Sequence, residues 1–384
     1  MHVGTTVLLG IVAFFWTVAA IELGRGVPSL ASLANAKPLA DPDCPFVSVL
    51  FAARDEAEKL PDALATLLAL DYPHYEVIAV DDRSEDATPE ILRAAAARDP
   101  RLKIVRVDEL PAGWLGKPHA LRKAYEKSTG EWLILTDADV HFAPQLLRRS
   151  VSLAREKRWE HLTLLGTAKL FTWGEKIVMT FFGMGFLIGT RPWAAHDANS
   201  RGYNGVGAFQ LITRSAYEKI GTHKRLAMEV VDDMKVGKLV KEAGLRSGVA
   251  KAGQMVSVHW HAGVGNLIRG TTKNFFATSG FKVGVTAAQI LGLLLFCVLP
   301  PATLPFVRGA ARVEAAISVV LPLIFECGVC REFGISFLYA LTYPVGALIF
   351  AWMLLRSTIV TLRQGGIIWR GTFYPLDELK RGVV

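Results

Sequence analysis

The amino-acid sequence predicts an α/β domain, built on a mainly parallel β-sheet, that is joined to transmembrane helices. Two observations predict this fold class. The 384 residues are 51% apolar, and many apolar residues are concentrated in long uncharged runs. Between the first two of these runs, short apolar segments of strand length alternate with segments of helical periodicity. With 20% charged residues and four scattered cysteines, the composition excludes a disordered chain and a disulfide framework.

Three uncharged runs are long enough to cross the hydrocarbon core of a bilayer. They contain 19 residues at 3–21, 25 residues at 283–307 and 23 residues at 333–355, and a helix needs about 20 apolar residues to cross. Two shorter runs, 14 residues at 177–190 and 11 residues at 315–325, are more typical of interfacial, re-entrant or buried helices. Three spans are the favoured prediction, and a continuous helix over 312–330 would make four.

The charges around the first run predict an orientation. Only His2 precedes the run, whereas Arg25 and Lys37 follow it, which favours an uncleaved anchor whose C-terminal side faces the cytoplasm. We therefore expect a multi-pass protein of the cytoplasmic (inner) membrane, with the α/β domain and the tail both in the cytoplasm. The expected organisation is an anchor at 1–22, a linker at 23–44, the α/β domain at 45–282 with an interfacial helix near 177–190, a span at 283–307, a loop with a short apolar segment at 308–332, a span at 333–355 and a tail at 356–384.

The α/β domain begins with a continuous apolar strand at 46–52. The pattern then predicts a helix at 56–70, a strand at 75–80, a helix at 88–97, a strand at 102–107, a helix at 118–127 and a strand at 131–136. Regular alternation of apolar strands and helices is typical of a parallel sheet covered on both faces. Ligands of such sheets bind at the carboxyl ends of the strands, so the residues just after each strand are the candidate site.

Pairs of aspartates follow two of these strands. Asp81 and Asp82 come after the strand at 75–80, where a carboxylate can cap the next helix or bind a ribose or base edge. Asp137 and Asp139 follow the strand at 131–136. Two carboxylates in one loop can hold a divalent cation, which in turn neutralises a diphosphate.

A third acidic pair, Asp232 and Asp233, begins a later helical segment. A carboxylate at this position can cap the helix or act as a general base toward an acceptor hydroxyl, and one aspartate could do each. Lys117 stands in a glycine-containing segment just before another helix, where a cation and exposed backbone N–H groups suit a phosphate. The candidate chemistry is therefore that of a nucleotide diphosphate.

Four segments, taken in order, resemble the family 2 glycosyltransferases with the GT-A fold: FVSVLFAARDEAEKL, YEVIAVDDRSEDAT, GWLGKPHALRKAYEKSTGEWLILTDADV and VVDDMKVGKLVKEAG. The resemblance covers residues 45–282, and the flanking spans resemble those of the membrane-bound, lipid-modifying members. It implies a Rossmann-like mixed sheet and a divalent cation, Mg²⁺ or Mn²⁺. It also implies that Asp81 or Asp82 contacts the nucleotide, that Asp137 and Asp139 bind the metal and the diphosphate, and that Asp233 is the base.

The sequence departs from the family in one motif. Many members carry QxxRW after the base, and here the corresponding region reads HWHAGVGNLIRGTTKNFFA, in which Arg269 or Lys273 could supply the missing cation. The tail IIWRGTFY resembles that of ceramide glucosyltransferases and of bacterial hopanoid-associated and carotenoid glycosyltransferases. Because Lys117 is otherwise the one expected cation, we expect Arg370 to reach the diphosphate, with interfacial anchoring as the alternative role. The expected nucleotide- and sugar-binding residues are Ala53, Arg54, Glu56, Asp81, Asp82, Lys117, Asp137, Asp232, Arg269, Trp369 and Arg370.

The resemblance implies an inverting, non-processive transfer of one sugar from a nucleotide sugar, expected to be a UDP-hexose, to a hydroxyl of a membrane lipid. Transfer to polyprenyl phosphate and non-catalytic binding of a nucleotide sugar are the alternatives. The expected partners are the nucleotide-sugar donor, the lipid acceptor and the bilayer, whose anionic head groups suit the net charge of +8. No nucleic-acid motif is present, so a nucleic-acid partner is not expected.

Overall fold

The computed structural model describes residues 3–384, which form two compact units. The helical unit comprises the chain up to Ser29, Lys169–Arg191 and Trp260–Ile367. The α/β unit comprises Leu30–Ala168, Pro192–His259 and Ile368–Val384. The C-terminal segment is therefore part of the α/β unit, although the intervening chain belongs to the helical unit.

The α/β unit is built on a mixed sheet, which has nine strands within residues 3–384. The strand order is β1-β9-β7-β8-β5-β2-β3-β4, with β6 paired to β9. Strands β5, β2, β3 and β4 are parallel neighbours, whereas β8 is antiparallel to both β5 and β7. This confirms the predicted mixed, mainly parallel sheet. The strands are β1 (Ala31–Ser32), β2 (Val47–Ala53), β3 (Tyr75–Asp82), β4 (Leu102–Val107), β5 (Trp132–Asp137), β6 (Val140–Phe142), β7 (His161–Ala168), β8 (Gln210–Thr213) and β9 (Ser247–Val258).

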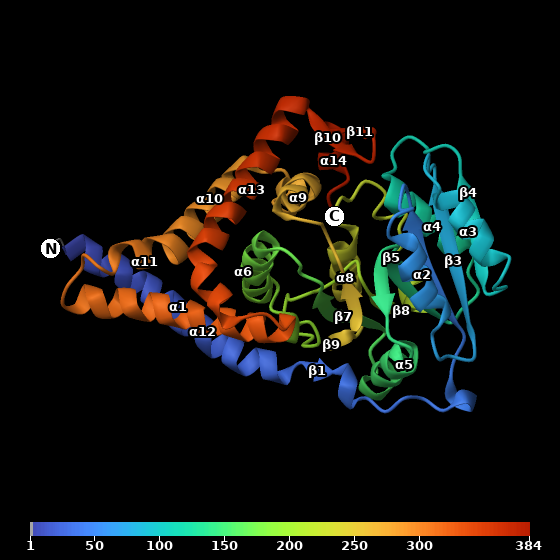
Figure 1. Ribbon diagram of the computed structural model, residues 1–384, viewed down its shortest axis with the longest axis horizontal. Helices are drawn as coiled ribbons and strands as arrows, with labels where there is room; N and C mark the ends of the chain where they lie inside the picture. Colours follow the sequence, from blue (N-terminus) through green and yellow to red (C-terminus); the bar gives the residue numbers. More distant parts are fainter. Residues whose placement is uncertain (1–2) are drawn as a thin grey trace. The chain divides into compact units, whose positions relative to one another are not determined.

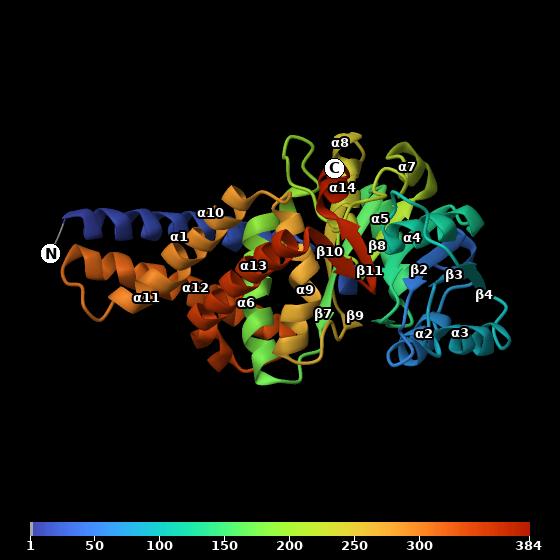
Figure 2. The same ribbon diagram turned by 90° about the horizontal axis from the view of Figure 1, so that it is seen from above.

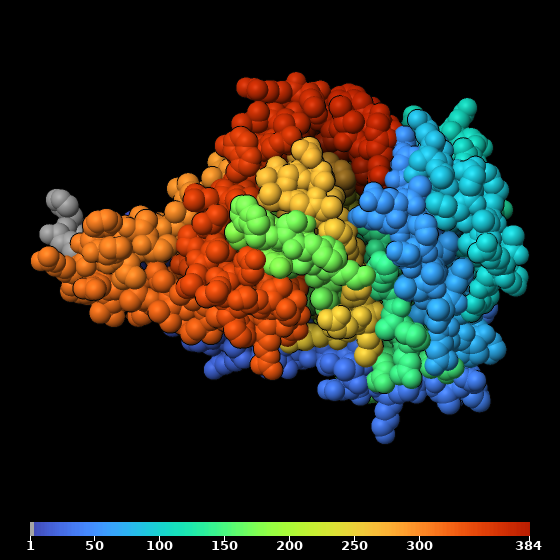
Figure 3. Space-filling view, in the orientation of Figure 1, coloured from blue at the N-terminus to red at the C-terminus, as the bar shows by residue number. Residues whose placement is uncertain are grey.

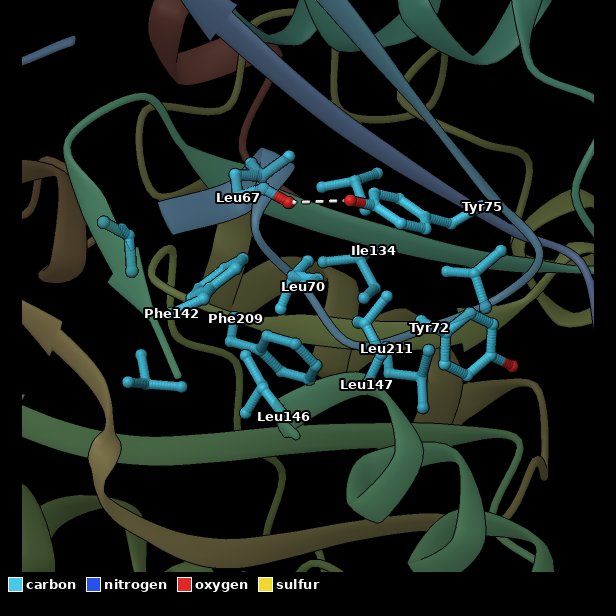
Figure 4. Packing of buried hydrophobic residues seen from close by; sticks show 14 of the residues in the cluster. Leu67, Leu70, Tyr72, Tyr75, Ile134, Phe142, Leu146, Leu147, Phe209 and Leu211 are labelled. Carbon is cyan, nitrogen blue, oxygen red and sulfur yellow. Dashed lines mark hydrogen bonds between the residues drawn. The ribbon is translucent and has the colours of Figure 1, made fainter. Parts of the chain in front are cut away.

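Helices cover both faces of this sheet, as Figure 2 shows for α2 and α3 on one side and α4 and α7 on the other. In β2, Val49 and Phe51 belong to the core cluster shared with α2 and α5, whereas Leu50 belongs to the cluster shared with α4 and α8. Figure 4 shows the first cluster. Both faces of the central strands are apolar because both are covered. The helices are α2 (Leu60–Leu68), α3 (Thr88–Ala96), α4 (Gly116–Lys127), α5 (Leu146–Lys157), α7 (Arg214–Lys219), α8 (Asp232–Glu242) and α14 (Leu376–Arg381), with short 3₁₀ turns at Leu33–Asn35, Asp41–Asp43 and Pro192–Ala194.

A buried carboxylate joins the amino ends of the central strands. Glu76 in β3 is 3% exposed and accepts hydrogen bonds from Ser48 Oγ at 2.7 Å, Thr129 N at 2.7 Å and Thr129 Oγ1 at 3.0 Å. Its second oxygen pairs with Lys103 Nζ at 2.6 Å. Although burial alone would raise it, these contacts hold the pKa of Glu76 below its usual value. Glu76 therefore ties β3 to β2, to β4 and to the turn before β5.

Several predicted boundaries are wrong. The first helix, α1 (Val3–Ser29), continues past the predicted anchor. Residues Ala31–Ser32 then pair with β9, and Leu33 is fully buried in the core. Much of the predicted linker at 23–44 is therefore structured. Asp81, Asp82 and Asp137 are the last residues of β3 and β5 rather than the first residues after them.

In the helical unit, α1 runs alongside α12 (Figure 1). Four segments are long and apolar enough to cross a membrane: Gly4–Ser29, Val283–Thr303, Ala310–Phe333 and Phe337–Gln364. By length and composition, the four-helix alternative therefore fits better than the favoured three, and the predicted loop at 308–332 is mostly helix. The elements are α1, α6 (Trp173–Thr190), α9 (Val264–Thr278), α10 (Val283–Leu293), a π turn (Leu294–Val298), α11 (Leu299–Thr303), α12 (Ala310–Phe333), a 3₁₀ turn (Phe337–Thr342) and α13 (Tyr343–Gln364), and the strand β10 (Gly366–Trp369) follows.

The π turn in the second apolar segment has a local cause. Pro300 has no backbone N–H, so the carbonyl of Phe296, four residues earlier, loses its usual helical donor. Trp16 Nε1 in α1 donates to that carbonyl at 2.9 Å, and the Trp16 side chain is 1% exposed. An indole from the first helix thus satisfies the carbonyl that the proline leaves unpaired.

Candidate functional site

The carboxyl ends of β2, β3 and β5 lie side by side in the α/β unit. Their register places Ala53 opposite Asp81 and Ala52 opposite Asp137. Parallel pairing of these three strands brings the first two predicted acidic clusters to one edge of the sheet. Ala53 is fully buried, so a ligand would meet its backbone rather than its side chain.

The two aspartates at the end of β3 have different surroundings. Asp81 is 1% exposed; it accepts a hydrogen bond from Ser84 N at 3.1 Å and pairs with Arg106. Asp82 pairs with both ends of the Arg83 guanidinium, at 2.8 Å and 3.0 Å. At Gly116, a Cβ would lie 2.5 Å from Asp82 Oδ2. Glycine there lets the first turn of α4 approach Asp82, which therefore faces the helix start that the sequence predicts as a phosphate site.

Each aspartate of the predicted metal pair contacts a lysine. Lys117 Nζ lies 2.6 Å from Asp137 Oδ1, and Lys59 Nζ lies 2.9 Å from Asp139 Oδ2. Although burial alone would lower it, the carboxylates of Asp137, Asp232 and Asp233 raise the pKa of Lys117, which keeps this side chain an ammonium. The two lysines balance the charge of the two carboxylates.

The donor set has the chemistry that Mg²⁺ or Mn²⁺ needs, because carboxylate oxygens are hard ligands. The backbone at Gly207 also comes close to two carboxylates, because a Cβ there would lie 2.6 Å from Asp137 Oδ2 and 3.3 Å from Asp233 Oδ2. Among residues 3–384, no group of three or more histidine, cysteine, aspartate or glutamate side chains converges as a complete metal site. The residues therefore fit a cation that takes its remaining ligands from phosphate and water, as Mg²⁺ commonly does.

The third acidic pair occupies the first turn of α8. Asp233 Oδ2 accepts from Gly207 N at 2.9 Å, and Asp233 Oδ1 accepts from Met234 N at 2.8 Å. Its burial among protein atoms and the neighbouring Asp232 charge raise the pKa of Asp233 above its usual value. Asp232 is 4% exposed and lies 3.9 Å from Lys117 Nζ through Oδ1. The two adjacent carboxylates therefore have different surroundings: Asp232 is buried beside Lys117, whereas Asp233 accepts two backbone hydrogen bonds and has a raised pKa, as suits a proton acceptor.

The C-terminal segment adds a β-hairpin, formed by β10 and β11 (Thr372–Pro375). Its two-residue loop, Arg370 and Gly371, has φ of 48° and 76°, as a type I′ hairpin requires. Arg370 Nη2 pairs with Glu56, and Tyr374 Oη accepts from Gly116 N at 3.3 Å. In Figure 3, red C-terminal atoms lie against the blue atoms that follow β2.

The other predicted binding residues have mixed outcomes. Arg54 Nη1 donates to Thr372 Oγ1 at 3.2 Å, and Trp369 ends β10 next to Arg370. Arg269 belongs to the helical unit, where it donates to Asn266 Oδ1 at 2.6 Å, so its role at the diphosphate stays a prediction.

The premise that Lys117 is the main cation near the strand ends is wrong. Lys59, Arg83 and Arg106 also pair with the predicted aspartates. Lys59 and Arg83 lie within two of the family-like segments, but nothing in those segments marked them as partners of the aspartates, and Arg106 lies in none of them. The site is therefore well supplied with positive charge before Arg370 is considered.

Comparison with known proteins identifies the domain. Residues 48–161 match the family described as Glycosyl transferase family 2. The beta-monoglucosyldiacylglycerol synthase of Trichormus variabilis is 35% identical over 116 residues, which are 30% of this chain and 24% of the relative. The 4,4'-diaponeurosporenoate glycosyltransferase of Staphylococcus haemolyticus is 24% identical over 246 residues, 63% of each chain. Each match thus spans less than two thirds of the relative's length.

A solved structure shows the same fold. The mannosyltransferase PcManGT from Pyrobaculum calidifontis, in complex with GDP-Man and Mn²⁺, aligns with 93% of this chain and 99% of its own, with a TM-score of 0.53 and 18% identity. The chain therefore carries a family 2 glycosyltransferase domain with the GT-A fold, and within residues 3–384 four helices are apolar enough to span a membrane. This confirms the resemblance and the fold class that the sequence predicted.

Proposed function

We propose that the protein transfers one sugar from a nucleotide sugar, such as a UDP-hexose, to a hydroxyl group of a membrane lipid, with inversion at the anomeric carbon. The observation that carries this proposal is the position of Asp233. It lies in the first turn of α8, beside Asp137 across Gly207, with a raised pKa. A carboxylate of this kind suits removal of a proton from a hydroxyl next to a bound diphosphate.

Each residue of the proposed site would have its own role in the sugar transfer. Asp82, at the end of β3, and Glu56, in the loop after β2, would contact the nucleoside and the sugar. Lys117, at the start of α4, would pair with the diphosphate that leaves. A Mg²⁺ or Mn²⁺ ion, held by Asp137 and Asp139, would neutralise further charge on the same diphosphate. Asp233 Oδ1 or Oδ2 would accept the proton of the lipid hydroxyl as its oxygen forms the new glycosidic bond.

A lipid acceptor is supported by the names of the relatives, which include a monoglucosyldiacylglycerol synthase and a diaponeurosporenoate glycosyltransferase. Transfer to polyprenyl phosphate is the second candidate, because another relative is an undecaprenyl-phosphate 4-deoxy-4-formamido-L-arabinose transferase of Shewanella sediminis, 32% identical over 114 residues. A phosphate acceptor is already ionised at neutral pH, so that reaction needs no base. The requirement for Asp233 therefore separates the two candidates.

The test is sugar transfer by membranes that contain the wild-type chain or Asp233→Asn, with labelled UDP-glucose as the donor and extracted lipids as acceptors. If the acceptor is a hydroxyl, the rate of sugar transfer by Asp233→Asn should be lower than that of the wild type by about 10²-fold or more. Asp62→Asn, which changes an exposed aspartate of α2, serves as the matched control and should keep wild-type activity. Undiminished transfer by Asp233→Asn would favour the phosphate acceptor, and binding of the donor without any transfer would leave the non-catalytic alternative.

The composition of the α/β unit supports a proposal for the membrane topology. Leu30–Ala168 and Ile368–Val384 belong to this one unit, and we propose that both lie on the same side of the membrane. The chain between them must then cross an even number of times, although it contains three candidate helices. If all three crossed once, the tail would end on the opposite side from the rest of its unit.

Helix α13 is the candidate that we assign to a non-crossing position. Its C-terminal half packs on α9 through polar contacts: Arg356 Nη1 donates to Thr272 Oγ1 at 2.5 Å, and Ser357 Oγ donates to Thr272 O at 2.5 Å. We therefore propose three crossings, by α1, by α10 with α11, and by α12, with the α/β unit in the cytoplasm. This proposal keeps the favoured number of three crossings and takes α12 in place of 333–355 as the third.

A further inference from the structure

A line of buried polar side chains leads from the interior of the α/β unit to the proposed diphosphate site. His223 lies between α7 and α8 and is 0% exposed, as is Tyr217. His223 Nδ1 lies 2.5 Å from Tyr217 Oη, and His223 Nε2 lies 3.3 Å from Asp232 Oδ2. The other oxygen of Asp232 faces Lys117 Nζ at 3.9 Å, and Lys117 contacts Asp137 at 2.6 Å.

The hydrogen bonds indicate which ring nitrogen of His223 carries the proton. Tyr217 Oη already accepts a hydrogen bond from the backbone N–H of His223 at 3.2 Å. Its own O–H can then donate to Nδ1, which leaves the N–H of the neutral ring on Nε2, directed at the carboxylate of Asp232. The opposite tautomer would place a lone pair against that carboxylate. Tyr217 thus favours the form of His223 that donates to Asp232.

His223 Nε2 is one of the partners of the Asp232 carboxylate. Asp232 is 4% exposed, it adjoins a second carboxylate in Asp233, and Lys117 is shared with Asp137. A buried carboxylate that loses a hydrogen-bond donor takes up a proton or turns toward another donor. Either change would remove or displace the negative charge that Asp232 places 3.9 Å from Lys117 Nζ.

We infer that Tyr217 and His223 are positioning residues for the glycosyl transfer: they orient Asp232, which holds the Lys117 ammonium in place for the diphosphate. Neither side chain touches the donor. This inference rests on the proposed function, because it assigns Lys117 to the diphosphate of a nucleotide sugar. The purely structural alternative is that the two side chains only fill and stabilise the space between α7 and α8.

The test measures binding of UDP in the presence of Mg²⁺ by the purified full-length protein in detergent, beside the melting temperature. His223→Leu removes the donor to Asp232 and is expected to weaken UDP binding about tenfold, as is typical for residues that orient a site's ligands. Tyr217→Phe keeps the ring and removes the hydroxyl, with an expected loss of about threefold. His223→Gln, whose amide can donate toward Asp232, should recover most of the affinity.

The decisive comparison is with Lys117→Ala. If Tyr217 acts through Lys117, the double variant Tyr217→Phe/Lys117→Ala binds UDP no more weakly than Lys117→Ala alone, whereas independent effects add. Tyr125→Phe is the matched control, because Tyr125 packs on the Tyr217 ring at 5.0 Å and donates to Glu218 outside this line of residues. It should leave UDP binding unchanged.

The outcomes distinguish this inference from the proposed function. If Lys117→Ala weakens UDP binding but Tyr217→Phe and His223→Leu lower the melting temperature alone, the positioning role is wrong and the proposed function stands. Additive losses in the double variant would also overturn the positioning role. If the wild-type chain binds neither UDP nor GDP, the nucleotide-sugar function fails, and this inference fails with it.

Discussion

Replacement of Arg370 tests whether the C-terminal segment contributes to binding of the diphosphate. Arg370 lies at the tip of the hairpin between β10 and β11, where its guanidinium pairs with Glu56 and lies 3.4 Å from Asp55 O. The side chain is 43% exposed. Replacement by lysine keeps the positive charge and the backbone conformation, since neither residue is favoured at positive φ. The change therefore removes one feature, the planar fork that can contact two phosphate oxygens.

Arg370→Lys is expected to change the stability of the protein and its kcat by different amounts. An exposed ion pair contributes at most about 1 kcal/mol to stability, so the melting temperature of Arg370→Lys should stay close to that of the wild type. If the guanidinium binds the diphosphate, loss of the fork should cost about 1.4 kcal/mol or more, which corresponds to a roughly tenfold fall in kcat. Anchoring at the membrane interface predicts no such fall, because lysine also suits that depth.

The assay is steady-state sugar transfer by the purified protein, with kcat and KM measured for the donor. Arg381→Lys is the matched control, because Arg381 lies in the same segment, in α14, and donates to Asp377 O at 3.2 Å. It should behave as the wild type. A kcat for Arg370→Lys within about twofold of the wild type, less than 0.5 kcal/mol, would refute the diphosphate role and leave Arg370 as a partner of Glu56 alone.

Three further predictions follow from the site, the sheet and the topology. Asp139→Ala should abolish transfer and Mg²⁺-dependent UDP binding with an unchanged melting temperature, and more than trace activity would contradict its role as a metal ligand; Asp137→Ala should be the milder change if that residue only orients the others. Glu76→Ala should destabilise the α/β unit by about 3 kcal/mol, seen as a lower melting temperature. Because the folded-state pKa of Glu76 is depressed, its stabilisation is present above the unfolded pKa and is lost as pH falls through the folded value, so the wild type and Glu76→Gln should converge in acid. A reporter fused after Val384 should be active in the cytoplasm, and an external reporter would contradict the three-crossing topology.

The sequence was most informative where local periodicity decides structure. The alternation over residues 46–136 predicted β2 to β5 and the helices between them, because β2, β3 and β5 are buried on both faces and each helix presents one apolar face. Pairing over long sequence distances has no such signature. The antiparallel β8, between β5 and β7, could not be inferred from its four residues.

The same reasoning explains which site residues were missed. Asp137 and Asp139 could be found because they end an apolar strand. Lys59 contacts Asp139 from 80 residues away, at the start of α2. Arg106 contacts Asp81 from 25 residues away in the neighbouring strand, where the register of the sheet brings the two together. His223 carries no motif at all and acquires its partners through the loop before α8.

The central claim, that this chain transfers a sugar to a lipid with Asp233 as the base, is tested most directly by mass spectrometry of the lipids of cells. Three cell lines would be compared, expressing the wild-type chain, Asp233→Asn at the same level, or no chain. We expect a lipid whose mass is raised by one sugar residue in wild-type cells and which is absent from the other two. Identical lipid profiles in wild-type and empty cells, or the same glycolipid in cells with Asp233→Asn, would contradict it.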